Sequence, residues 1–163
     1  MTLSADALRD IGLFAALPED ALGFLAGTLA LVELGPGELA FREGDEGREL
    51  FVLLSGELEV MKRSRSGLDA RVAMLGPRDW FGEMSVLDVM PRSATIRALS
   101  ASKLVRIASS DLDALYRRDM KSYALIVLNM AREMSRRLRV SDGLVAELVA
   151  NAAEVYSARH GRG

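Results

Sequence analysis

Residues 81–95 read FGEMSVLDVMPRSAT, a stretch that has a glycine near its start and a proline near its end. Gly82 permits a close approach of the backbone to a ligand, or a φ that other residues resist. Glu83 offers acceptor oxygens for a sugar diol, Arg92 offers a rigid fork of donors that suits a phosphate, and Ser93 adds a hydroxyl donor. These residue types predict a pocket for a phosphorylated sugar such as a nucleotide. The alternative is an ordinary turn with a surface ion pair between Glu83 and Arg92.

Short strands are predicted on both sides of this stretch. They cover residues 31–34, 38–42, 50–54, 57–62 and 71–75 before it, and a further hairpin, 95–99 with 103–107, after it. Turns rich in glycine, proline and aspartate separate the strands at spacings of roughly 8–12 residues, which is typical of an antiparallel sandwich or barrel. Residues 81–95 therefore form an insertion in the barrel. Their middle, residues 83–88, is predicted to form one helical turn whose backbone N–H groups face an anion.

Two short helices are predicted ahead of the strands, within residues 1–30. Ser4 has the side chain of an N-cap for a helix at residues 4–10. Pro18, followed by two acidic residues, marks the first turn of the second helix. The barrel that follows is predicted to occupy residues 31–108.

Residues 109–157 are predicted to be helical, and residues 158–163 to be a disordered tail. Ser109 or Ser110 caps the first helix, and the second runs for some 30 residues, or about 45 Å. An apolar stripe follows this second helix: Tyr123, Val127, Met130, Met134, Leu138, Val145, Leu148, Ala152 and Val155. Because a domain of this size cannot cover the whole helix, its distal part is predicted to pack on another chain. Gly143 is a predicted kink or end point.

Composition excludes several classes of protein. Hydrophobic residues make up 50% of the 163 residues, which is incompatible with a disordered chain and sufficient for one domain with a core. The chain has no cysteine and one histidine, His160, so neither a metal site nor a Ser/Cys-His catalytic group is expected. No apolar run approaches the roughly 20 residues of a membrane span, and the N-terminus does not resemble a signal peptide. These features predict a cytoplasmic protein that is not an enzyme.

Charge is unevenly distributed along the chain. The net charge of −2 is too small to imply a nucleic-acid partner by itself. From residue 117 to residue 139 there are seven basic residues against two acidic ones, which predicts a helix with a basic face. Such a face is solvated by default. DNA binding through it is the less favoured alternative, because a basic stripe alone binds weakly and in a salt-sensitive way.

The chain resembles the cyclic nucleotide-binding domain that bacterial catabolite activator-type regulators, regulatory subunits of cyclic-AMP-dependent kinase and cyclic-nucleotide-gated channels share. The resemblance runs from about residue 11 to residue 138. It rests on GELAFREGD at residues 37–45, LFVLLSGELEV at residues 50–60 and the phosphate-binding cassette at residues 81–95, in this order. It implies an α+β fold, in which an antiparallel β-roll of the jelly-roll type is flanked by N-terminal helices and a long C-terminal helix.

The resemblance also implies roles for residues of the cassette. Glu83 would accept a hydrogen bond from the ribose 2′-OH, Arg92 would pair with the cyclic phosphate, and Ser93 would donate to a phosphate oxygen. The backbone N–H groups of Gly82 and Ala94 would add further contacts. Loss of Arg92 would weaken binding by one to two powers of ten or more, since each charge-assisted bond contributes roughly 1.5–3 kcal/mol.

The other candidate ligand contacts come from three parts of the chain. They are Met84 and Ser85 in the cassette, Val72 and Leu75 in the barrel, and Arg137 and Ser141 in the long helix. In the family the long helix closes over the base, and residues 136–142 are the matching segment here. Exposure of Arg137 and Ser141 to solvent is the alternative.

The function implied is that of a regulatory module that binds a cyclic nucleotide and responds by a rearrangement of its C-terminal helices. The ligand is cAMP, with cGMP left open, and no other cofactor is expected. The expected partner is a second copy, through the long helix, or an effector protein. Since the chain ends about 20 residues after Asp142, it resembles a stand-alone domain without the helix-turn-helix of the regulators, or a fragment of a longer protein. A ligand-free structural or interaction module of the same fold is the alternative.

Overall fold

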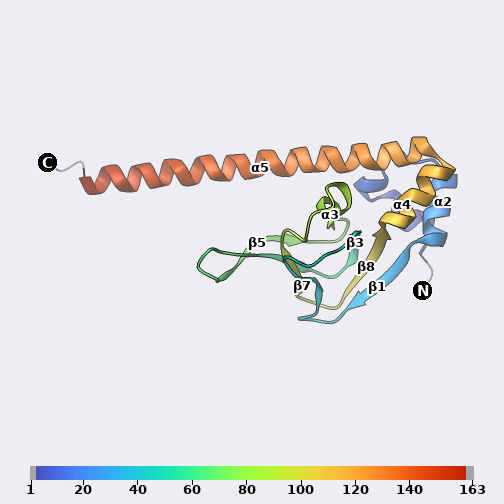
Figure 1. Ribbon diagram of the computed structural model, residues 1–163, viewed down its shortest axis with the longest axis horizontal. Helices are drawn as coiled ribbons and strands as arrows, with labels where there is room; N and C mark the ends of the chain where they lie inside the picture. Colours follow the sequence, from blue (N-terminus) through green and yellow to red (C-terminus); the bar gives the residue numbers. More distant parts are fainter. Residues whose placement is uncertain (1–2, 161–163) are drawn as a thin grey trace.

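Within residues 3–160, which the computed structural model describes with the side chains of residues 3–154, eight strands form two four-stranded antiparallel sheets (Figure 1). The first sheet has the order β1 (Ala30–Leu34), β8 (Ser102–Ala108), β3 (Glu49–Ser55) and β6 (Trp80–Phe81). The second has the order β2 (Leu39–Phe41), β7 (Thr95–Ala98), β4 (Leu58–Arg63) and β5 (Asp69–Leu75). The predicted α+β fold with an antiparallel β-roll is confirmed.

Two features of the sheets differ from the prediction. Strand β6 was not predicted, and it pairs with Phe51 and Val52 of β3 immediately before the cassette. The predicted hairpin of residues 95–99 and 103–107 is wrong, because β7 pairs with β2 and β4 whereas β8 pairs with β1 and β3. Alternating apolar residues identify a strand, but they do not say which sheet it joins.

Two apolar clusters hold the fold together. The first fills the roll and consists of Phe51, Leu53, Leu58, Leu75, Phe81, Ile96, Ala98 and Leu104. The second lies between the first sheet and the helices, and it includes Leu8, Phe14, Leu25, Val52, Leu115 and Met130. Strand β3 contributes to both clusters, because its successive side chains point to opposite faces of the sheet. This explains the nearly continuous apolar run at residues 50–54.

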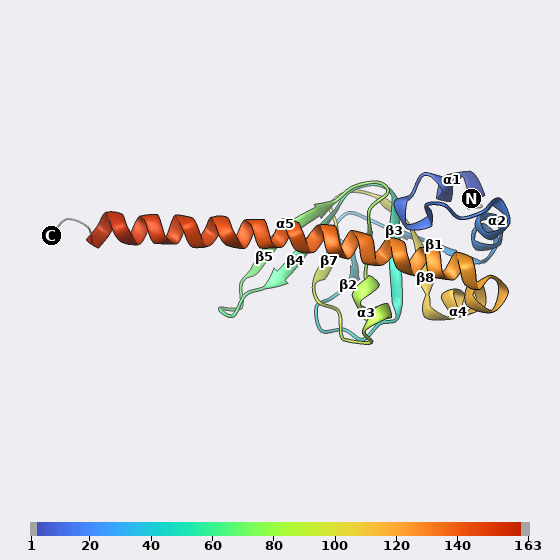
Figure 2. The same ribbon diagram turned by 90° about the horizontal axis from the view of Figure 1, so that it is seen from above.

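The N-terminal elements are short and lie at one end of the roll, next to α4 (Figure 2). They are helix α1 (Ala5–Arg9), the 3₁₀ helix η1 (Gly12–Phe14) and helix α2 (Glu19–Thr28). The Ser4 hydroxyl accepts a hydrogen bond from the backbone N–H of Ala7 at 3.2 Å, which confirms the predicted N-cap. Pro18 occupies the N-cap position of α2, one residue before its first turn.

Helix α4 (Ser109–Arg118) begins at the first residue of the predicted helical region. Its N-cap residue is Ala108, whose N–H donates to the Asp111 carboxylate at 2.8 Å. The predicted serine cap is therefore wrong. The Ser109 hydroxyl instead donates to the backbone carbonyl of Arg48 at 2.8 Å, which ties the helix to the loop ahead of β3.

Helix α5 (Met120–His160) is 41 residues long and continuous. The predicted kink or end at Gly143 is wrong, because exposed helix tolerates a glycine at a cost of only about 1 kcal/mol. The prediction of a disordered tail at residues 158–163 is wrong for residues 158–160, which continue the helix. Residues 161–163 lie outside the described part of the chain.

The first half of α5 is anchored on the protein. Ile126 and Met130 are fully buried against the N-terminal elements. Between them, the buried Asn129 donates from Nδ2 to the carbonyl oxygens of Leu13 at 3.1 Å and Ala15 at 3.0 Å. These contacts lay the helix across the roll, over the cassette helix α3 (Glu83–Leu87) (Figures 1 and 2).

The second half of α5 projects beyond the roll, and its side chains from residue 138 to residue 154 are all exposed (Figure 1). The large apolar ones are Leu138, Val140, Leu144, Val145, Leu148 and Val149, each more than half exposed. The predicted apolar stripe is thus covered by the protein's own core only as far as Met134. Among the described helices, none combines the length and apolarity that crossing a bilayer requires.

Candidate ligand-binding site

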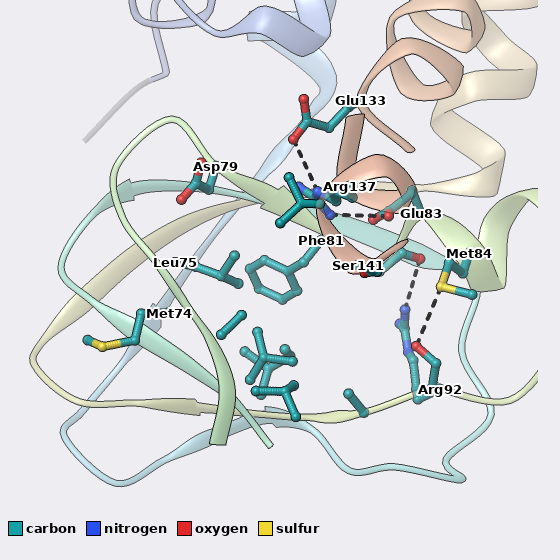
Figure 3. Close-up of a pocket in the computed structure, with 18 of the residues that line it drawn as sticks. Met74, Leu75, Asp79, Phe81, Glu83, Met84, Arg92, Glu133, Arg137 and Ser141 are labelled. Atoms are coloured by element: carbon teal, nitrogen blue, oxygen red, sulfur yellow. Dashed lines mark hydrogen bonds and ion pairs between the residues drawn. The ribbon is translucent and has the colours of Figure 1, made fainter. Parts of the chain in front are cut away.

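A cavity of about 650 Å³ lies between the roll, the cassette and helix α5. Every residue predicted as a ligand contact lines it: Val72, Leu75, Gly82, Glu83, Met84, Ser85, Arg92, Ser93, Ala94, Arg137 and Ser141. Figure 3 shows the charged members of this set along one side and an apolar floor around Phe81. The structure therefore brings together side chains that come from β5, the cassette and the C-terminal helix.

The cassette backbone depends on its glycine. Gly82 is the N-cap of α3 and has φ +85°, a left-handed conformation that other residues adopt at a cost. A Cβ at this position would also lie 2.8 Å from Arg92 Nη1 and 2.9 Å from the carbonyl oxygen of Glu49. The short helix that follows confirms the predicted turn at residues 83–88. Further along, Val89 has φ +51°, a strained conformation for a β-branched residue.

Arg92 is 4% exposed and is held from several sides. Its Nη1 donates to the carbonyl oxygens of Glu49 at 2.6 Å and Gly82 at 3.3 Å, and its Nη2 donates to the Glu49 carboxylate at 2.8 Å. The guanidinium carbon lies 4.1 Å from the centre of the Phe41 ring. Burial lowers the pKa of Arg92, and the carboxylates of Glu49 and Asp45 oppose this shift. Its Nε is buried and has no hydrogen-bond partner among the described residues.

Glu83 is 6% exposed and pairs with helix α5. Arg137 Nη1 lies 3.3 Å from the Glu83 carboxylate, and Arg137 Nη2 donates to the Trp80 carbonyl at 2.7 Å. Arg137 Nε completes the arrangement with a hydrogen bond to Glu133 at 3.1 Å (Figure 3). Arg137, predicted as a contact of the base, thus lines the cavity with its donors directed toward protein oxygens.

Comparison with known proteins agrees with this geometry. A family model described as the cyclic nucleotide-binding domain matches residues 31–119, more than half of the chain. The chain belongs to the cyclic nucleotide-binding domain family.

Relatives of this cyclic nucleotide-binding domain are longer proteins. It is 30% identical over 142 residues to a CRP-like cAMP-activated global transcriptional regulator of Mycobacterium tuberculosis, which covers 87% of this chain and 62% of that protein. The crystal structure of Thermus thermophilus catabolite activator protein is similar with a TM-score of 0.74 and 31% identity, over 85% of this chain and 63% of that one. The co-crystal structure of the regulatory domain of Toxoplasma gondii PKA with cAMP is similar with a TM-score of 0.63 and 32% identity. The match covers 68% of this chain and 42% of that one. The chain therefore spans less than two thirds of each of these relatives.

Several residues of the pocket in this cyclic nucleotide-binding domain were not predicted. They are Phe41, Val60, Ala73, Met74, Asp79, Phe81, Ile96, Glu133, Arg136, Val140 and Leu144. The alternating pattern of residues 57–62 does indicate that Val60 faces inward. Arg136 and Val140 belong to the segment 136–142 that the resemblance places over the base, whereas Glu133 lies outside it and carried no such signal. Among the described side chains, none of the His, Asp and Glu residues form a group that could hold a metal ion.

Ser93 lines the same cavity, beside Met84 and Arg92. Its hydroxyl donates to the sulfur of Met84 at 3.6 Å (Figure 3). Lys62 donates to the Ser93 carbonyl and fixes the backbone beside it. Because a thioether is a weak acceptor, the Ser93 hydroxyl can turn toward a stronger one at little cost.

Proposed function

We propose that this domain binds a cyclic nucleotide, with cAMP as the first candidate, and that binding changes the position of helix α5. The observation that carries the proposal is the buried Arg92 guanidinium, whose Nε lacks a partner among the described residues beside a cavity that also contains Glu83. A donor in that position suits an anionic oxygen, and the nearby carboxylate suits a sugar hydroxyl.

The phosphate end of the ligand would lie at the cassette. Arg92 would supply the charge, Ser93 a hydroxyl donor, and Gly82 and Ala94 their backbone N–H groups. Glu83 would then accept from the ribose 2′-OH. All five residues line the cavity, which supports this placement.

The base would lie at the apolar end of the cavity. Val72 and Leu75 line it from β5, and Ser141 lines it from α5. The cavity volume of about 650 Å³ lies within the ordinary range for a small-molecule site. The names of the relatives favour cAMP, since one is called cAMP-activated and another was crystallised with cAMP. The choice between adenine and guanine remains open, because a hydroxyl at position 93 is compatible with either base.

The coupling to α5 would pass through Glu83. This carboxylate already pairs with Arg137 of the helix, and the ribose would add hydrogen bonds to the same group. A ligand that touches both the roll and the helix favours the helix position in which it makes more contacts. We therefore propose a regulatory and non-catalytic role, in the cytoplasm.

The proposed partner is a second copy of the chain. Leu138, Val145 and Leu148 are 62%, 58% and 68% exposed, and their spacing of seven and three residues continues the heptad pattern of a coiled coil. An exposed apolar stripe of this length marks an interaction surface. Since Ser141 lies on the same half of α5 and lines the cavity, pairing of two helices would reach the ligand site.

Calorimetric titration with cAMP and with cGMP tests the proposal. We expect binding heat and a rise in melting temperature with at least one of the two. Arg92→Lys is expected to weaken binding by roughly 10- to 100-fold, because a point charge replaces the fork of donors. Arg97→Lys is the matched control, since Arg97 pairs with Glu59 and is not among the residues that line the cavity. Absence of heat and of a thermal shift at millimolar ligand would favour the ligand-free alternative.

A further inference from the structure

Met84 is an exposed residue whose sulfur lies beside the proposed phosphate contact Ser93. Met84 is 49% exposed and lines the cavity together with Ser93. Its Sδ accepts the hydrogen bond of the Ser93 hydroxyl at 3.6 Å (Figure 3). Arg92 precedes Ser93 in the chain, so a chemical change at this sulfur would act next to both proposed phosphate contacts.

We propose that Met84 is an oxidation site through which a peroxide lowers the affinity of the pocket for its ligand. The inference rests on the proposed function. In the reaction, the Sδ lone pair attacks one oxygen of the peroxide, the O–O bond breaks and an S–O bond forms. The sulfur is oxidised by two electrons to the sulfoxide, and the second peroxide oxygen leaves as water or as an alcohol.

The sulfoxide acts on the ligand through Ser93. The Ser93 hydroxyl has one proton to donate, and a thioether holds it weakly. A sulfoxide oxygen is a strong acceptor on a longer and more polar side chain, so it retains that proton and reaches further into the cavity. The phosphate loses the hydroxyl donor, and binding is expected to weaken by about tenfold or more.

Three other methionines provide an internal comparison. Met90 is 58% exposed but is not among the residues that line the cavity, so its oxidation leaves the proposed phosphate contacts intact. Met74 is 47% exposed and lines the cavity from β5, at the proposed base end. Met130 is fully buried and is expected to react slowly. Exposure alone therefore does not distinguish Met84 from the other exposed methionines. Its contact with the Ser93 hydroxyl is what links its oxidation to the proposed phosphate site.

The test is to treat the whole protein with hydrogen peroxide and to measure the ratio of cyclic nucleotide affinities before and after treatment. Peptide mass spectrometry follows each methionine in parallel. We expect the affinity to fall by about tenfold or more as Met84 is converted, and to recover after reduction by methionine sulfoxide reductases. Met84→Leu is expected to abolish the change in this ratio, and Met90→Leu, the matched control, to retain it.

Two results would overturn the inference, and they are distinguishable. If the untreated protein binds no cyclic nucleotide, the proposed function fails and the inference fails with it. If the untreated protein binds, but full conversion of Met84 leaves the affinity unchanged or Met84→Leu loses affinity on treatment as the parent does, only the inference fails.

Discussion

Arg92 is the residue at which distant parts of the chain meet. It belongs to the cassette, but its charge is paired with Glu49 of β3 and its guanidinium lies over Phe41 of β2. Glycine at position 47 leaves the room that this arrangement needs, because a Cβ there would lie 2.5 Å from Nε and Nη2 of Arg92. The position of the proposed phosphate donor therefore depends on a loop residue more than forty positions away.

This dependence predicts that Gly47→Ala weakens cyclic nucleotide binding. The added methyl group pushes the Arg92 guanidinium away from its position beside Glu49. The proposed phosphate then loses one charge-assisted bond to Arg92, which corresponds to about tenfold or more in affinity. Calorimetric titration measures the change. Gly76→Ala is the control, since a Cβ at Gly76 meets nothing within 4 Å. Equal affinities for the two variants would show that Arg92 adjusts without loss.

A second prediction concerns the pair of Glu83 and Arg137. Arg137→Leu leaves a 94% buried carboxylate without its charged partner, which is expected to lower the free energy of unfolding by about 1–3 kcal/mol. In Glu83→Gln/Arg137→Leu part of this loss is recovered, with a coupling energy of about 1 kcal/mol. Urea denaturation of the parent, Glu83→Gln, Arg137→Leu and the double variant gives the four free energies of unfolding of a double-mutant cycle. Strictly additive effects would contradict a direct interaction.

Helix α5 is the element that connects the N-terminal helices, the roll and the cavity. Its N-terminus is capped by Asp119, whose carboxylate accepts from the backbone N–H groups of Lys121 at 3.1 Å and Ser122 at 3.2 Å. The hydrogen bond from the Ser122 hydroxyl is the main cause that lowers the pKa of Asp119 below its ordinary value of 3.8. The charged form of this carboxylate is thus favoured by folding.

The cap predicts a pH dependence of stability. Because the pKa of Asp119 is lower in the folded protein than in the unfolded one, its contribution is fully present above the ordinary value of 3.8 and is lost as the pH falls through the lower, folded-state pKa. Asp119→Asn retains a cap but does not titrate in this range. The melting temperatures of parent and variant are therefore expected to converge as the pH is lowered from about 6 toward 2. Asp113→Asn, at an exposed position on α4, is the control, and a parallel fall of all three curves would contradict the prediction.

At the scale of the whole molecule, the exposed half of α5 carries a row of uncovered apolar side chains: Leu138, Val140, Leu144, Val145, Leu148 and Val149. Every described side chain of α5 from residue 138 onward is exposed. A helix that a monomer leaves half uncovered gains stability when two copies pair along it.

The surface predicts a dimer that a single charge disrupts. Leu148→Glu places a carboxylate in the proposed seam and is expected to convert the dimer to a monomer in sedimentation velocity. Ala150→Glu, two residues further and on the opposite side of the helix, adds the same charge and is expected to leave the dimer intact. A monomeric parent protein, or equal masses for the two variants, would contradict pairing through this stripe.

Much of the site could be predicted because its chemistry is local. Glu83, Arg92 and Ser93 lie within one short stretch, and a left-handed glycine at position 82 follows from the need for a tight turn before α3. The strands follow from alternation and turn residues in the same way. The assignment of β7 and β8 to one hairpin was wrong because neither pattern contains information about distant partners.

The amino-acid sequence by itself determined most of the strands and helices, the family and the cassette residues that line the cavity. Only the tertiary structure decided that Glu49 holds Arg92, that Arg137 reaches Glu83, and that Asn129 fastens α5 to the segment around Leu13. The physical reason is the range of the interactions. Helix caps, turns and periodic apolar residues act over a few positions, whereas these hydrogen bonds join groups that are between 43 and 116 positions apart and become neighbours only when the roll and the long helix pack together.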